Sequence, residues 1–156
     1  MATKARRSRL LAAVAALVFL HFALDPVVEA WYAKPNLLLC ALLMSARQIR
    51  PAGAAALGLC LGVLEDAMAV NNFGLTAILL VLLGYAAAQT RDLFLGEEPF
   101  FVGTYLFLGT WLYETVAYLL MDANGNVFSY LFLRIPLDAL ATGVLGYAVL
   151  PFVRTR

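Results

Sequence analysis

The chain alternates long apolar runs with short polar breaks. Six apolar runs cover residues 10–30, 35–49, 51–70, 74–91, 98–121 and 135–153. A helix needs roughly 20 residues to cross the hydrocarbon core of a bilayer. The second run is the weakest, since its apolar core from Pro35 to Ala46 is short. The pattern predicts an all-α polytopic membrane protein with six transmembrane helices, built as one integral membrane domain over residues 1–156.

The polar breaks carry the residues typical of tight connections between helices. Turns are predicted at 71–74, 96–99 and 121–126, and Arg50-Pro51 precedes the third run. In Gly96-Glu-Glu-Pro99 the acids and the proline lie where the first turn of a helix favours them. An aromatic-rich segment at 127–133 precedes Pro136, at which the last span is expected to begin.

Composition agrees with the membrane assignment and leaves no room for a soluble domain. Hydrophobic residues make up 63% of the 156 residues and charged residues only 13%. Soluble domains are closer to 45–50% apolar and about 25% charged.

The basic residues indicate the orientation of the chain. With the N-terminus inside and six spans, 9 of the 11 Lys and Arg residues lie on the cytoplasmic side, and only Lys34 and Arg134 lie outside. This distribution follows the positive-inside rule. It predicts a multi-pass protein with both termini in the cytoplasm.

The N-terminal run admits a second interpretation. Basic residues before Leu10 and the small residues of Val28-Glu-Ala30 resemble a cleavable signal peptide. We expect an uncleaved anchor instead. Cys40, Cys60 and the single histidine, His21, are expected to be packed residues, because they form neither a disulfide framework nor a metal-binding pattern.

Small residues recur at every fourth position of the third run. Ala54, Gly58, Gly62 and Asp66 therefore share one helix face, which we call the small-residue seam. Its GxxxG motif allows another helix backbone to approach closely. A carboxylate facing lipid is costly, so Asp66 is expected to accept hydrogen bonds from backbone N–H groups of the following turn and the next span. Glu65 is expected to extend to the outer surface.

Five segments carry recognisable motifs, namely Pro35-Asn-Leu-Leu-Leu39, Arg47 to Pro51, Gly58 to Asp66, Asn72 to Leu75 and Leu83-Gly-Tyr85. Together they resemble the MreD family of rod shape-determining membrane proteins. They follow the family's P-D-L-L entry, its G-x-x-x-G with a later Asp, its G-L-x-A and its G-Y. The specific part covers residues 35–90. Asn36 replaces a frequent acid, and Glu65 adds a charge beside Asp66.

This resemblance implies a non-enzymatic role in cell-shape control and peptidoglycan synthesis, in the bacterial inner membrane. Family members associate with MreC and, through it or directly, with MreB, RodA and a class B penicillin-binding protein. The implied fold is similar to the substrate-binding subunits of energy-coupling-factor vitamin transporters. The motif residues, which would hold the bundle and shape its partner-binding surface, are Gly58, Gly62, Asp66, Gly74, Gly84 and Tyr85.

An acid also lies near the middle of the fifth run. A charged Glu114 at that depth carries a large free-energy cost unless it is paired, so the side chain is expected to be paired or neutral. We expect it to form hydrogen bonds inside the bundle with Thr110, Tyr113 or Tyr118. The alternative is a pocket or a contact with a partner.

Two further charges lie at the start of the last run. Arg134 and Asp138 are four residues apart on one helix face, and we expect them to pair locally. A partner-facing or relay role is the alternative.

The remaining patterns argue against other functions. A single histidine excludes an HExxH protease, and the chain has no phosphate-binding glycine loop with a lysine. We therefore predict neither an enzyme nor a cofactor. Nucleic-acid binding is not predicted, because the membrane topology accounts for the basic residues. Contact with membrane lipid is predicted. The main rival is a vitamin-binding subunit of an energy-coupling-factor transporter, supported by the AxxxA of Ala12 and Ala16. A solute-coupled permease is a third option.

Overall fold

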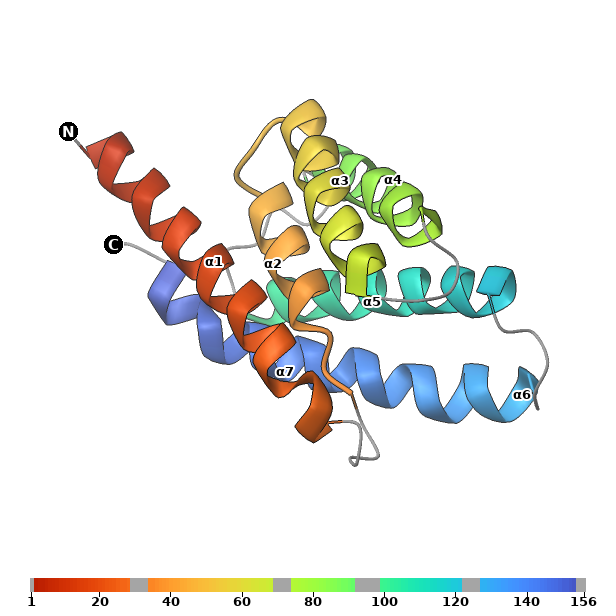
Figure 1. Cartoon of the computed structure of the whole chain (residues 1–156). Coiled ribbons are helices and arrows are strands. Elements are labelled where there is room, and N and C mark those ends of the chain that lie inside the picture. Colours follow the sequence, from red (N-terminus) through yellow and green to blue (C-terminus); the bar gives the residue numbers. More distant parts are fainter. Residues whose placement is uncertain (1, 29–33, 69–73, 92–98, 122–126, 154–156) are drawn as a thin grey trace.

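The computed structural model describes residues 2–28, 34–68, 74–91, 99–121 and 127–153 (Figure 1). The predicted turns at 71–74, 96–99 and 121–126, and the possible cleavage site at 28–30, fall wholly or partly outside these residues.

The described residues are helical apart from short connections, which confirms the all-α prediction. The helices are α1 (Ala2–Val28), α2 (Leu37–Ala46), α3 (Pro51–Met68), α4 (Leu75–Thr90), α5 (Pro99–Met121), α6 (Val127–Ser129), η2 (Tyr130–Arg134) and α7 (Ile135–Val153). Each predicted run contains a helix. Among the described residues, Pro51–Met68 and Tyr130–Ala148 are long and apolar enough to cross a membrane. That all six runs do so remains a prediction.

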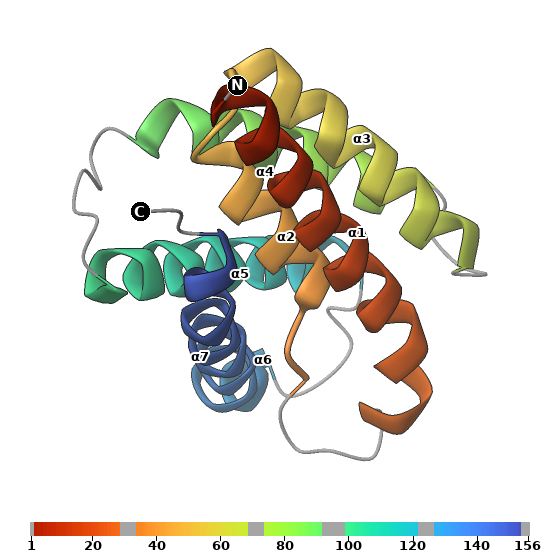
Figure 2. The ribbon, with the colours of Figure 1, turned by 90° about the vertical axis from the view of Figure 1, so that its left-hand side faces the viewer.

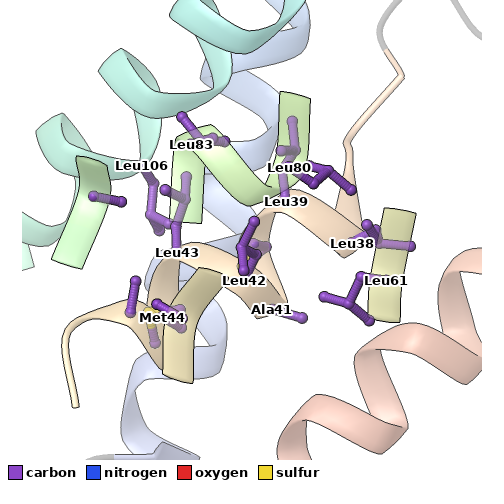
Figure 3. Packing of buried hydrophobic residues seen from close by; sticks show 14 of the residues in the cluster. Leu38, Leu39, Ala41, Leu42, Leu43, Met44, Leu61, Leu80, Leu83 and Leu106 are labelled. Carbon is purple, nitrogen blue, oxygen red and sulfur yellow. The ribbon is translucent and has the colours of Figure 1, made fainter. Parts of the chain in front are cut away.

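Helix α2 forms the centre of the bundle. All ten of its residues are buried, and its leucines pack against Leu61, Leu80 and Leu106 from three other helices (Figure 3). At 1.5 Å per residue, α2 is about 15 Å long, half the hydrocarbon thickness of a bilayer. The helix within the second run therefore covers about half of that thickness, and the crossing of this run stays a prediction.

The other helices surround α2 in two close pairs and one single helix. Helices α3 and α4 form one pair and α5 and α7 the other, while α1 lies diagonally across α2 (Figures 1 and 2). Leu17 of α1 is buried, with Val14, Val18 and Phe22 packed against the same core. The first turn of α1 and the last turn of α7 lie at the same end of the bundle (Figure 1).

The last helix begins earlier than predicted. Helical structure runs without a break from Val127 to Val153, so Pro136 lies inside the helix instead of starting it. Residues 130–134 form a π-helical turn, in which the N–H of Ile135 donates to the carbonyl of Tyr130. Proline at position 136 is tolerated because it is the second residue of α7, next to this wider turn.

Candidate functional site

The small-residue seam packs against α4 along its whole length. A Cβ atom added at Gly58 would overlap the backbone carbonyl of Leu80, and one at Gly62 would lie 2.8 Å from the backbone nitrogen of Ala77. From the other side, a Cβ on Gly84 would lie 2.6 Å from the carbonyl oxygen of Ala54. The close approach that GxxxG permits is therefore made within this chain.

Asp66 ends the seam and caps the neighbouring helix. Its Oδ2 atom accepts hydrogen bonds from the backbone N–H of Gly74 at 2.9 Å and from that of Ala77 at 3.0 Å. These are the contacts predicted from the cost of a lipid-facing carboxylate. Gly74 has a φ of 93° and brings no side-chain cap of its own. Asp66 thus supplies from α3 the acceptor that the first turn of α4 lacks.

Glu65 differs from its prediction. The side chain is half-buried, and its Oε2 atom is buried, so it does not extend freely to the outer surface. Its carboxylate lies close enough to Tyr113 of α5 for an electrostatic interaction, as does that of Asp66. The Met68 end of α3 therefore lies close to Tyr113 of α5.

Tyr85 occupies a different environment from the other motif residues. It is 48% exposed on α4, and its hydroxyl accepts a hydrogen bond of 3.2 Å from the Nε2 atom of Gln89. Gly58, Gly62, Asp66 and Gly84 are buried between α3 and α4, and Gly74 begins the turn of α4. Of the six motif residues, Tyr85 is the one whose side chain is directed outward.

Glu114 is half-buried on α5, close enough to Asp138 of α7 for their carboxyl groups to interact. Two of its three predicted hydrogen-bond partners, Thr110 and Tyr118, have other surroundings. The Oγ1 atom of Thr110 is buried without a partner, and the ring of Tyr118 stacks on Tyr130 at 4.3 Å between centroids. Helical spacing predicted these neighbours but not where their side chains point.

Asp138 binds the start of α2 and also interacts electrostatically with Arg134. Its Oδ1 atom accepts a hydrogen bond of 2.6 Å from the backbone N–H of Lys34. Arg134 is exposed and lies over the ring of Tyr130, and its charge acts on Asp138 from there. The prediction named Arg134 but missed the hydrogen-bond partner of Asp138, which lies more than 100 residues away in the sequence.

Thr142 completes this contact and was missed by sequence reasoning. Its Oγ1 atom accepts a hydrogen bond of 3.0 Å from the backbone N–H of Asn36 and donates one of 2.9 Å to the carbonyl of Asp138. Asn36 in turn caps α2 by accepting from the N–H of Leu39. Asp138 and Thr142, four residues apart, thus bind the residues that lead into α2. That spacing was the available signal.

The opposite end of α2 is held by residues first noted only for their charge. The Nη1 atom of Arg91 donates a hydrogen bond of 2.9 Å to the carbonyl of Ile49. The guanidinium of Arg47 lies 5.9 Å from the ring centroid of Tyr105, whose hydroxyl donates to the carbonyl of Ala87 at 3.0 Å. Both arginines therefore fix the turn between α2 and α3.

These polar groups serve to join helices. Among the described residues, no group of three or more His, Cys, Asp and Glu residues is arranged to hold a metal ion. Cys40 is buried in α2 as predicted, whereas Cys60 is exposed on α3, so its prediction as a packed core residue was wrong. His21 packs edge-on against Phe22 with 5.2 Å between ring centroids.

The model of one protein family, described as rod shape-determining protein MreD, matches residues 7–155. The chain belongs to the MreD family. As a member, it is a non-enzymatic membrane protein of rod-shape determination, and the match extends the recognition from residues 35–90 to almost the whole chain. No curated protein and no solved structure matches the chain significantly. The likeness to vitamin-transporter subunits therefore stays a prediction.

Proposed function

We propose that the chain is a scaffold of the cell-wall elongation complex in the bacterial inner membrane, with both termini in the cytoplasm. It binds the transmembrane helix of MreC and, through MreC or directly, associates with MreB, RodA and a class B penicillin-binding protein. Membership of the MreD family supports this role. The polar side chains of Asp66, Arg91 and Asp138 support it as well, since each joins segments of the same bundle.

The small-residue seam is not the surface that we assign to the partner helix. Its glycines are buried against α4, and a helix from another protein would have to displace α4 to reach them. The seam therefore fixes the internal frame. A partner helix must use a face that the bundle leaves exposed.

Helix α1 offers such a face with small side chains. Ala12, Ala15 and Ala16 are exposed, and they lie on the side of α1 opposite Leu17, which is buried in the core. Small residues four apart let two helix backbones approach closely in a membrane, where van der Waals packing drives association. We assign the transmembrane helix of MreC to this alanine face (Ala12, Ala15 and Ala16).

The test is recovery of partners from detergent-solubilised native membranes, read by mass spectrometry. The wild-type chain is expected to recover MreC together with RodA and the penicillin-binding protein. The double variant Ala12→Leu, Ala16→Leu is expected to lose at least about 10-fold of the MreC, corresponding to about 1.4 kcal/mol.

Ala86→Leu is the matched control, because Ala86 is an exposed alanine of α4. It is expected to recover MreC at the wild-type level. Full recovery by the double variant would refute the alanine face. Recovery of an ATPase pair with a coupling transmembrane subunit, in place of MreC, would refute the scaffold itself.

A further inference from the structure

The helix that ends the chain begins with an exposed aromatic turn. Phe128, Phe132 and Leu133 expose 75%, 67% and 65% of their surface, and the two phenylalanine rings are in contact at 4.6 Å between centroids. We call these three residues the aromatic ledge. It lies at the far end of the bundle from the first turn of α1 (Figure 1).

Arg134 is held beside this ledge by two stacked tyrosines. Its guanidinium lies 5.5 Å from the ring centroid of Tyr130. Tyr130 in turn stacks on Tyr118 of α5, with 4.3 Å between centroids and 15° between planes. The cation therefore has a defined position although its side chain is exposed.

Asp138 interacts with Arg134 electrostatically but leaves its guanidinium exposed. Asp138, one helical turn further on, is buried and accepts a hydrogen bond from the backbone of Lys34. Glu114 is on α5, half-buried, and interacts with Asp138. A fixed guanidinium flanked by exposed rings is thus available to an anion from outside the bundle.

The position of Arg134 along the helix indicates which anion this is. The apolar segment long enough to cross a membrane begins at Tyr130, so Arg134 lies within its first two turns. Tyrosines such as Tyr130 concentrate at this level, where the polar headgroups meet the acyl chains, and arginines near helix ends extend to it. Phosphate is the anion that every phospholipid carries there, and a guanidinium binds it through two parallel N–H donors.

We propose that Arg134 and the aromatic ledge form a binding site for a membrane phospholipid, with the guanidinium on the phosphate and the exposed rings against the glycerol and upper acyl chains. The π-helical turn at 130–134 belongs to the site, because it places Tyr130 beneath Arg134, and π-helical turns are frequent at functional sites. The proposal requires α7 to cross the membrane but does not depend on binding of MreC.

The test measures lipid binding to the purified full chain in detergent by native mass spectrometry. The probes are dioleoyl phosphatidylglycerol and dioleoylglycerol, which lacks the phosphate. Arg134→Gln is expected to weaken binding of the phospholipid about 10-fold and to leave dioleoylglycerol unchanged. Arg134→Lys keeps the charge but loses the paired donors, and an intermediate loss is expected.

Arg50→Gln is the matched control, because Arg50 is an exposed arginine of the turn before α3. It is expected to leave this Arg134-dependent binding unchanged. Equal losses in the two variants would mean that charge alone attracts the lipid, and no loss in Arg134→Gln would remove the phosphate contact. Either result overturns the proposal, as does displacement of the lipid by excess inorganic phosphate.

Two rival occupants are tested separately. Asp122→Asn removes an acid that precedes this helix in the sequence and is expected to leave lipid binding unchanged. A 10-fold gain would mean that Arg134 pairs with Asp122. A photo-cross-linking amino acid in place of Phe132, activated in native membranes, is expected to give an adduct of phospholipid mass that Arg134→Gln reduces. An adduct with a protein instead would overturn the assignment to lipid.

Discussion

Gly62→Ala is expected to destabilise the protein although it adds a single methyl group to a helix. The new Cβ would overlap the Cα of Ala77 and lie 2.8 Å from its backbone nitrogen, whereas ordinary contacts begin at 3.4 Å. The obstacle is backbone, so rotation of a side chain cannot relieve the overlap. Helices α3 and α4 must therefore move apart by at least 0.6 Å, the difference between 3.4 and 2.8 Å.

The magnitude follows from three contributions. Overpacking costs typically about 1–3 kcal/mol, and a backbone obstacle favours the upper end of that range. Separation of the helices also lengthens the hydrogen bonds from Gly74 and Ala77 to Asp66, now 2.9 and 3.0 Å, which adds about 1 kcal/mol. Alanine regains about 1 kcal/mol through its higher helix propensity. The expected net loss is about 2–3 kcal/mol in the free energy of unfolding.

Gly53→Ala on the same helix is the matched control. Its Cβ would meet only Ile49, at 3.9 Å, so the gain in helix propensity is unopposed and stability should rise by up to about 1 kcal/mol. Reversible unfolding of the detergent-solubilised proteins by dodecyl sulfate, followed by far-ultraviolet circular dichroism, measures both variants. Equal free energies of unfolding for the two variants would refute the close packing of α3 on α4.

Two further substitutions test the ends of α2 in the same unfolding assay. Thr142→Val keeps the shape of the side chain but leaves the N–H of Asn36 without its acceptor, so a loss of about 1–3 kcal/mol in the free energy of unfolding is expected. The control Thr142→Ser keeps the hydroxyl and should retain most of the stability. Equal free energies of unfolding for the two variants would contradict this contact. Tyr105→Phe removes the hydroxyl that donates to Ala87 but keeps the ring beside Arg47, so a loss of about 1 kcal/mol is expected. A larger loss, as great as that of Tyr105→Leu, would show that the ring and not the hydrogen bond was affected.

Sequence reasoning succeeded where one physical cost dominated. The helices followed from the length of the apolar runs, and the cap formed by Asp66 followed from the cost of a carboxylate facing lipid. In both cases only one local conformation avoids a large free-energy cost. The partners of Asp66 also lie within 11 residues, so they were accessible to local reasoning.

The errors concern contacts between distant segments. Asp138 had a suitable partner one turn away in Arg134, yet it binds a backbone group 104 residues earlier. The four-residue spacing of Asp138 and Thr142 indicates a shared polar face but does not identify Lys34 and Asn36 as the residues that approach it. The same holds for the small-residue seam, because a GxxxG motif specifies close approach but not whether the approaching helix belongs to the same chain.

The contacts of α2 also restrict the order in which the protein is made. A ten-residue helix is too short to remain across a bilayer as it leaves the ribosome. The groups that receive its leading end, Asp138 and Thr142, are synthesised about 100 residues later. The centre of the bundle can therefore form only after the last helix has been synthesised. A nascent chain that stops before Thr142 contains every residue of α2 but lacks the groups that bind the start of this helix.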